Sequence, residues 1–192
     1  MNYLELIGTF IGIIYLWLEY RVSIYLWIAG LIMPAIYLAV YYRAGLYADF
    51  GINIYYLLAS LYGLYCWLRG NRNISSASDS PLRPRRMPKR LYGRLSLISV
   101  LLLLCIAGIL IRFTDSNVPW LDSLTTALSI TAMWMLARKY VEQWLVWMCV
   151  DAVSCGLYVY KELYFTAALY GAYTVIAVLG YRKWKKLMEK PI

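Results

Sequence analysis

Long apolar runs separated by short polar gaps fill most of the chain. Crossing a lipid bilayer as a helix takes about 20 mostly apolar residues. Runs close to this length cover seven stretches: Leu4–Leu18, Ile24–Tyr42, Leu46–Leu68, Leu95–Ile111, Leu121–Ala137, Val141–Tyr160 and Tyr164–Tyr181. The pattern therefore predicts an all-α integral membrane protein with seven transmembrane helices. Pro34 lies inside the second run and predicts a kink or unwound backbone, because proline cannot donate a helix hydrogen bond.

The two ends of the chain match each other without a gap at a displacement of 117 positions. The matched pairs include Trp17/Trp134, Arg21/Arg138, Trp27/Trp144, Tyr41/Tyr158, Tyr56/Tyr173, Gly63/Gly180 and Trp67/Trp184. Each copy holds three predicted spans, and one further span between the copies restores the chain direction. The sequence thus predicts two parallel three-helix repeats joined by one linking helix (3+1+3). Such duplication is typical of transporters, which bind substrate between the two halves.

The basic residues predict the orientation of the chain in the membrane. Of 19 lysines and arginines, 16 fall in the gaps after the first, third, fifth and seventh spans. The positive-inside rule then places the N-terminus outside and the C-terminus in the cytoplasm. The expected segments are 1–68 (first repeat), 69–94 (cytoplasmic basic linker), 95–112 (linking helix), 119–184 (second repeat) and 185–192 (cytoplasmic basic tail). No packed structure is expected for Gly70–Pro88.

Composition indicates that lipid surrounds most of this chain. Hydrophobic residues make up 62% and charged residues 15%, against about 45–50% and 25% in soluble domains. The net charge of +9 lies between apolar runs, which indicates topology and argues against a nucleic-acid partner. Histidine is absent, which excludes Ser–His nucleophiles and H-E-x-x-H zinc sites. The four cysteines lack C-x-x-C spacing and are expected to be small buried residues, with neither disulfides nor metal.

The strongest candidate site is a stripe of residues in the sixth span. Trp144, Trp147 and Asp151 are spaced three and four apart, which places them on one helix face. Indoles and a carboxylate suit a flat organic cation, because aromatic faces attract cations and the acid supplies the opposite charge. The alternative is an interfacial tryptophan pair with an aspartate bonded to a neighbouring helix. The first repeat has Gly30 and Pro34 at the positions of Trp147 and Asp151, so a single substrate held mainly by the second copy is expected.

Other polar groups at membrane depth are weaker candidates. Asn53, with Tyr56 on the same face, is either a site residue or an interhelical hydrogen-bond partner. Asp122 begins the fifth span, with Ser129 further along it, and the aspartate is favoured as a capping or interface group. Five tyrosines are candidates for lining a polar path, with packing or interface anchoring as the alternative for each: Tyr15, Tyr37, Tyr41, Tyr56 and Tyr173.

The chain resembles the PnuC family of bacterial vitamin transporters over nearly its whole length except the linker. The motifs that carry the resemblance are Asp122-Ser123, Ser129-Ile130, Arg138-Lys139-Tyr140-Val141-Glu142 with Trp144 and Trp147, and, nearer the N-terminus, Ile7-Gly8-Thr9, Trp27-x-x-Gly30, Leu46-Tyr47-Ala48 and Tyr62-Gly63-x-Tyr65-x-Trp67. The resemblance implies a seven-span fold like an enlarged SWEET sugar carrier. It also implies facilitated uptake of nicotinamide riboside across the inner membrane, a homotrimer, and trapping of the vitamin by a cytoplasmic kinase, without a cofactor, coupling ion or ATP site.

At one position the chain departs from the family pattern. The W-x-x-x-N residues of the family contact substrate, and they correspond to Trp147 and position 151, where this chain has Asp151. A carboxylate suits the cationic ring of nicotinamide riboside or of thiamine, which other relatives carry, whereas a neutral flavin would gain nothing from it. Nicotinamide riboside is the leading expectation and thiamine the alternative. An intramembrane enzyme is disfavoured because no nucleophile–base pair or metal spacing exists, and a membrane receptor or assembly subunit remains the other reading.

Overall fold

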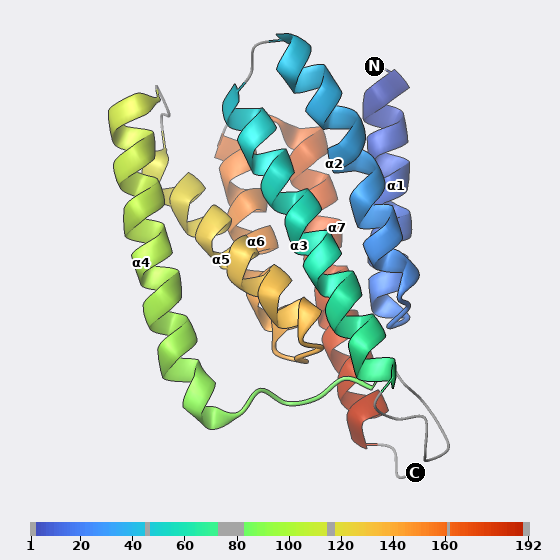
Figure 1. The fold of residues 1–192 in the computed structure, drawn as a ribbon. Coiled ribbons are helices and arrows are strands. Elements are labelled where there is room, and N and C mark those ends of the chain that lie inside the picture. Colours follow the sequence, from blue (N-terminus) through green and yellow to red (C-terminus); the bar gives the residue numbers. More distant parts are fainter. Residues whose placement is uncertain (1–2, 45–46, 73–82, 115–117, 161, 190–192) are drawn as a thin grey trace. The chain divides into compact units, whose positions relative to one another are not determined.

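The computed structural model describes residues 3–44, 47–72, 83–114, 118–160 and 162–189. These residues form seven helices: α1 (Tyr3–Tyr20), α2 (Tyr25–Ala44), α3 (Tyr47–Arg72), α4 (Lys89–Phe113), α5 (Pro119–Ala137), α6 (Gln143–Tyr160) and α7 (Tyr164–Glu189). Figure 1 shows them in chain order from blue to red. Apart from an isolated backbone bridge between Arg85 and Tyr140, the described residues contain no strand pairing. The prediction of an all-helical chain with seven helices is confirmed.

The chain divides into two compact units, with the boundary between Arg83 and Pro84. In the first unit, α1 packs on α2 and α2 packs on α3. In the second, α4 packs on α5, α5 on α6 and α6 on α7. Each unit is described by itself below.

The sequence duplication is reproduced in the turn between the first and second helix of each repeat. Val22, between α1 and α2, has φ 56°, and Lys139, between α5 and α6, has φ 60°. This left-handed backbone is uncommon outside glycine, so its recurrence at a displacement of 117 marks one turn used twice. The matching bonds are Ser23 N–H to the Leu18 carbonyl (2.9 Å) with Tyr140 N–H to the Met135 carbonyl (3.0 Å), and Trp27 N–H to the Ile24 carbonyl (3.1 Å) with Trp144 N–H to the Val141 carbonyl (3.2 Å).

The same correspondence governs the side chains beside these turns. The Arg21 guanidinium lies 4.9 Å from the centre of the Trp17 ring, and that of Arg138 lies 5.5 Å from the Trp134 ring. A cation over an aromatic face is attracted by the ring quadrupole, which favours this arrangement at the polar end of a helix. The two repeats therefore share local packing as well as backbone.

Several sequence expectations need correction. The helix expected from Leu95 begins at Lys89, and α3 continues to Arg72, so both ends of the expected linker are helical. Met87, in the linker, is buried, which contradicts the expectation that this stretch lacks packed structure. Residues 73–82 lie outside the described part of the chain. α2 runs through Pro34 as one helix, so the backbone is not unwound there.

The four cysteines are free in this structure, and they are not buried. Cys105 and Cys149 are exposed and Cys66 and Cys155 are half-buried. Each lies on a helix. Because none of the four side chains is buried, the expectation of small buried residues is wrong. Within the described ranges, no group of three or more acidic or cysteine side chains is arranged to hold a metal ion.

Among the described residues, α4 is the helix long and apolar enough to cross a membrane by length and composition. Its outer surface is a band of leucine and isoleucine. Leu97, Leu101 and Leu104 are 61%, 54% and 51% exposed. Water would disfavour so much contiguous apolar surface, whereas lipid would not.

Candidate substrate-binding site

Asp151 lies in the middle of α6 and is 7% exposed. No hydrogen bond or ion pair from the described residues reaches its carboxylate. An acidic group taken out of water is strongly destabilising unless it is paired or hydrogen-bonded. A buried acid that no described residue pairs with is therefore a functional candidate for binding a cation or a hydrogen-bond donor.

Two tyrosines of α7 lie near this acid, and a tyrosine of α6 packs against one of them. Tyr170 and Tyr173, both on α7, lie within electrostatic range of the Asp151 carboxylate. The Tyr170 ring contacts Tyr158 on α6, with ring centres 5.1 Å apart, and Tyr173 at 5.7 Å. These rings give the acid a wall of aromatic faces and hydroxyl groups. A flat cation with hydrogen-bonding substituents is the kind of molecule that such a wall accommodates.

Trp147 lies one helical turn before Asp151 on the same face of α6, as predicted. Its Nε1–H is buried and has no acceptor among the described residues. A buried donor without a partner is uncommon in folded proteins. Among the described residues, this face of α6 thus has a donor without an acceptor at Trp147, as also at Trp144, and an acceptor without a donor at Asp151.

The two repeats carry side chains of different size at the position of Trp147, and the positions matched to its surroundings differ in the opposite sense. In the first unit this position is Gly30. A Cβ added to this glycine would lie 3.1 Å from the Tyr15 ring and 3.0 Å from the Ser60 hydroxyl. The Ser60 hydroxyl also donates to the Gly30 carbonyl at 3.2 Å. The repeat counterparts of Tyr15 and Ser60 are Ala132 and Ala177, which are 0% and 1% exposed. The repeat that has the large indole therefore has alanine at both matched positions. The repeat that has glycine has tyrosine and serine there.

Trp144 packs inside the second unit. It is 1% exposed, and its ring meets Trp184 edge-on at 5.7 Å. It also lies directly against Gly180, where an added Cβ would be 2.7 Å from the ring. The first unit repeats this arrangement with Trp27, Trp67 and Gly63. The ring packs in the same way in both units, which favours a packing role for Trp144, and Trp147 is the indole of the predicted stripe closest to Asp151 along the helix.

The candidates of the first repeat lie in the first unit. Asn53 on α3 is half-buried, and Tyr56, one turn further on, is 36% exposed with its ring 5.5 Å from Tyr55. The displacement of 117 pairs Asn53 with Tyr170 and Tyr56 with Tyr173. These positions on α3 are thus the counterparts of the α7 residues beside Asp151. Tyr41 is on α2, but its side chain lies outside the described part of the structure.

Asp122 and Ser129 are on α5, which packs on α6. Asp122 is half-buried in the first turn of the helix, where the helix dipole stabilises its negative charge. Its carbonyl accepts hydrogen bonds from the hydroxyls of Thr125 (3.1 Å) and Thr126 (2.7 Å). The N-cap position of α5 is Val118, without a side-chain cap bond, so the capping or interface role of the Asp122 carboxylate stays a prediction. Ser129 is half-buried in the middle of α5.

Sequence reasoning missed Tyr170 as a neighbour of the candidate acid, and Tyr158 as a ring that packs on Tyr170. The signal was available, because Tyr158 pairs with Tyr41 and Tyr170 with Asn53 under the repeat displacement. Both partners in the first repeat were already candidates. Applying the displacement of 117 to every candidate of the first repeat would have identified Tyr158 on α6 and Tyr170 on α7 as candidates.

A family model described as nicotinamide mononucleotide transporter matches residues 2–186. The chain belongs to this family. The resemblance to PnuC proteins seen in the sequence is thereby confirmed, and the family is one of membrane transporters rather than enzymes.

Relatives in the transporter family align over most of their length. The nicotinamide riboside transporter PnuC of Escherichia coli (strain K12) is 24% identical over 206 aligned positions, covering 96% of this chain and 85% of that protein. The riboflavin/roseoflavin transporter RibM of Streptomyces davaonensis is 25% identical, covering 94% and 83%. A crystal structure of the vitamin B3 transporter PnuC matches with a TM-score of 0.69 at 22% identity, covering 93% of this chain and 79% of that one. At that identity the structural match establishes the fold.

Proposed function

We propose that this chain carries a cationic aromatic vitamin, nicotinamide riboside in the first place, into the cell across the inner membrane. The observation that carries the proposal is the buried carboxylate of Asp151, which no described residue pairs with, on the helix face of Trp147 and near the tyrosines of α7. The pyridinium ring of nicotinamide riboside supplies a positive charge for the acid and a flat face for the rings. Its ribose hydroxyls and amide supply partners for the indole N–H and the tyrosine hydroxyls.

The relatives are named for different vitamins, so the charge at position 151 is the feature that indicates which vitamin this chain carries. The PnuC and RibM relatives are similar to this chain to nearly the same degree, at 24% and 25% identity, so overall similarity does not separate a pyridinium from a flavin. A buried carboxylate discriminates between them, because it stabilises a cation and leaves a neutral flavin with an uncompensated charge to cover. Thiamine, whose thiazolium ring is also cationic, is the second candidate on the same observation.

The proposed mechanism is alternating access without chemical change to the vitamin. Two parallel three-helix repeats with α4 as the link would expose the site to either side in turn, with the N-terminus outside and the C-terminus in the cytoplasm. The basic residues concentrated after α1, α3, α5 and α7 support this orientation. Net uptake would depend on phosphorylation by a cytoplasmic kinase, and a homotrimer is the proposed assembly. Cysteine labelling of the two termini in intact cells tests the orientation, and the mass of the purified complex tests the assembly.

Counterflow in vesicles of purified protein tests the function. Vesicles preloaded with unlabelled nicotinamide riboside should accumulate the labelled vitamin transiently and without an energy source. Excess thiamine should compete less than nicotinamide riboside, and riboflavin should compete least. Stronger competition by thiamine would make thiamine the substrate, and strongest competition by riboflavin would contradict the role given to Asp151. Binding without counterflow would favour the receptor reading instead of a carrier.

A further inference from the structure

The segment just before α4 is bound along the turn between α5 and α6. The Arg85 N–H donates to the Lys139 carbonyl at 2.9 Å, and the Val141 N–H donates to the Arg85 carbonyl at 3.0 Å. These two bonds form a parallel backbone bridge. Figure 1 shows the segment passing beneath the lower ends of α5 and α6 before it enters α4.

The carboxylate of Glu142 closes the same junction with both of its oxygens. Oε2 accepts the Met87 N–H at 3.0 Å, and Oε1 accepts the Tyr92 hydroxyl at 3.2 Å. One side chain at the start of α6 thereby holds the segment before α4 and the first turn of α4 itself. Hydrogen bonds to an ionised acceptor are about twice as strong as neutral ones.

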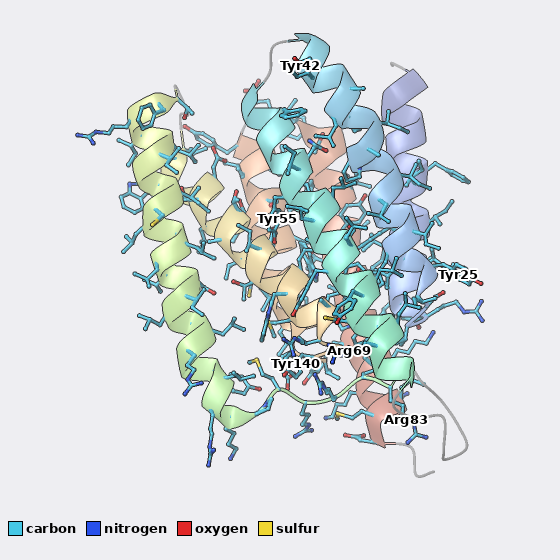
Figure 2. The ribbon with its side chains drawn as sticks, in the orientation of Figure 1. Tyr25, Tyr42, Tyr55, Arg69, Arg83 and Tyr140 are labelled. Atoms are coloured by element: carbon cyan, nitrogen blue, oxygen red, sulfur yellow. The ribbon has the colours of Figure 1, made fainter. Side chains whose placement is uncertain are left out.

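Apolar and cationic contacts extend the junction. Met87 is buried with Met135 and Tyr140. The Arg85 guanidinium lies 5.0 Å from the centre of the Tyr140 ring, and its Nε donates to the Arg138 carbonyl at 3.0 Å. Figure 2 shows Tyr140 at this end of the second unit. We name the segment 84–88 together with Glu142 the latch.

The rest of α4 is held to the second unit by few polar contacts. Near its middle, the Ser99 and Thr131 hydroxyls are 2.7 Å apart and hydrogen-bonded. Most of its large apolar residues face outward, although Ala107 is 1% exposed. Lipid tails cover leucine as well as another helix does, so polar contacts and close packing decide whether such a helix stays docked. The first unit has Tyr25, which is 64% exposed, at the position of Glu142.

We propose that the latch makes α4 a fixed part of the second unit, so that α4 moves together with α5 and α6 when the transporter changes its access. The statement about movement rests on the proposed transport function, whereas the docking of α4 by Glu142 does not. The proposal makes Glu142 the residue on which the docking of α4 depends.

Hydrogen–deuterium exchange of the full chain in lipid nanodiscs tests the docking without any substrate. Glu142→Ala should speed amide exchange in residues 84–92 by about tenfold or more, because both hydrogen bonds to its carboxylate, one of them partly buried, are lost. Tyr92→Phe, which removes one bond and keeps the carboxylate, should give a smaller increase in the same residues and keeps the test informative if Glu142→Ala does not fold. Glu189→Gln and Tyr25→Phe are matched controls on exposed side chains and should change nothing there. Exchange equal to that of the unmodified chain in Glu142→Ala or in Tyr92→Phe would overturn the latch.

A cross-link tests the movement. Cysteines at positions 99 and 131, with the four native cysteines replaced by serine, place sulfurs where the two hydroxyls now meet, which is within reach of a disulfide. Oxidation should leave nicotinamide riboside counterflow within twofold of the reduced protein, because α4 and α5 keep their contact throughout. A block on oxidation that a reductant reverses would show that α4 slides on α5 and would overturn the proposal. If the unmodified chain moves no vitamin, the transport function fails, and the exchange experiment alone decides the latch.

Discussion

The Trp144 ring lies against the backbone of Gly180, so that a methyl group on the glycine would be 2.7 Å from the indole. The same relationship holds between Trp27 and Gly63 in the first unit. A glycine on the third helix of each repeat gives the tryptophan of the second helix a flat surface. The two helices can then approach closely, which is the usual reason for small residues at helix contacts in membranes.

Gly180→Ala should destabilise the second unit. The added Cβ would overlap a buried ring that has no room to move, and overpacking of this kind costs about 1–3 kcal/mol. Gly156→Ala is the matched control, because nothing lies within 4 Å of a Cβ at that position and alanine is about 0.5–1 kcal/mol better than glycine within a helix. Thermal unfolding in detergent should therefore move in opposite directions for the two variants. A melting temperature for Gly180→Ala at or above the original would contradict this packing.

Trp144→Phe and Trp147→Phe should differ in kind. The first change leaves a cavity between α6 and Gly180, and large-to-small core changes typically cost a few kcal/mol, so stability falls. The second removes an indole face and N–H near Asp151, so vitamin affinity should fall several-fold while the melting temperature changes little. Thermal unfolding and vitamin binding on the same preparations separate the two effects. Equal loss of stability in both variants would make Trp147 a packing residue as well.

Asp151→Asn should change vitamin preference in a fold that is retained. Losing the charge should weaken nicotinamide riboside binding by about ten- to a hundredfold, since charged contacts contribute about 1.5–3 kcal/mol. Riboflavin binding should be unchanged or stronger, because the uncompensated charge is gone. The measurement is equilibrium binding of both vitamins, with Glu189→Gln as a control that changes an exposed acid. Unaltered affinity for both vitamins would remove Asp151 from the site.

The difference in side-chain size between the repeats predicts that substitutions at Gly30, Tyr15 and Ser60 have strongly coupled effects on folding. Gly30→Trp alone should prevent folding, because Tyr15 and Ser60 already fill the space beside the glycine. Adding Tyr15→Ala and Ser60→Ala copies the residues of the second unit and should restore much of the lost yield. Side chains in contact couple by about 0.5–3 kcal/mol, and here the coupling should favour the triple variant. Yield of monodisperse protein on size exclusion measures it, and a triple variant no better than Gly30→Trp would refute this coupling.

The sequence by itself determined the helices, their number and the duplication, because apolar runs of bilayer length and the displacement of 117 are properties of residue order alone. It also placed Trp147 and Asp151 on one face of α6, since helix periodicity fixes that without any neighbour. Three things required the tertiary structure. Trp144 became a packing residue only once Gly180 was seen beside it, and Tyr170 joined Asp151 only through the contact of α7 with α6. The basic segment before α4 was expected to lack packed structure because its composition is polar. It is held instead by Glu142, whose partners at Met87 and Tyr92 are distant in sequence and meet it only in the folded chain.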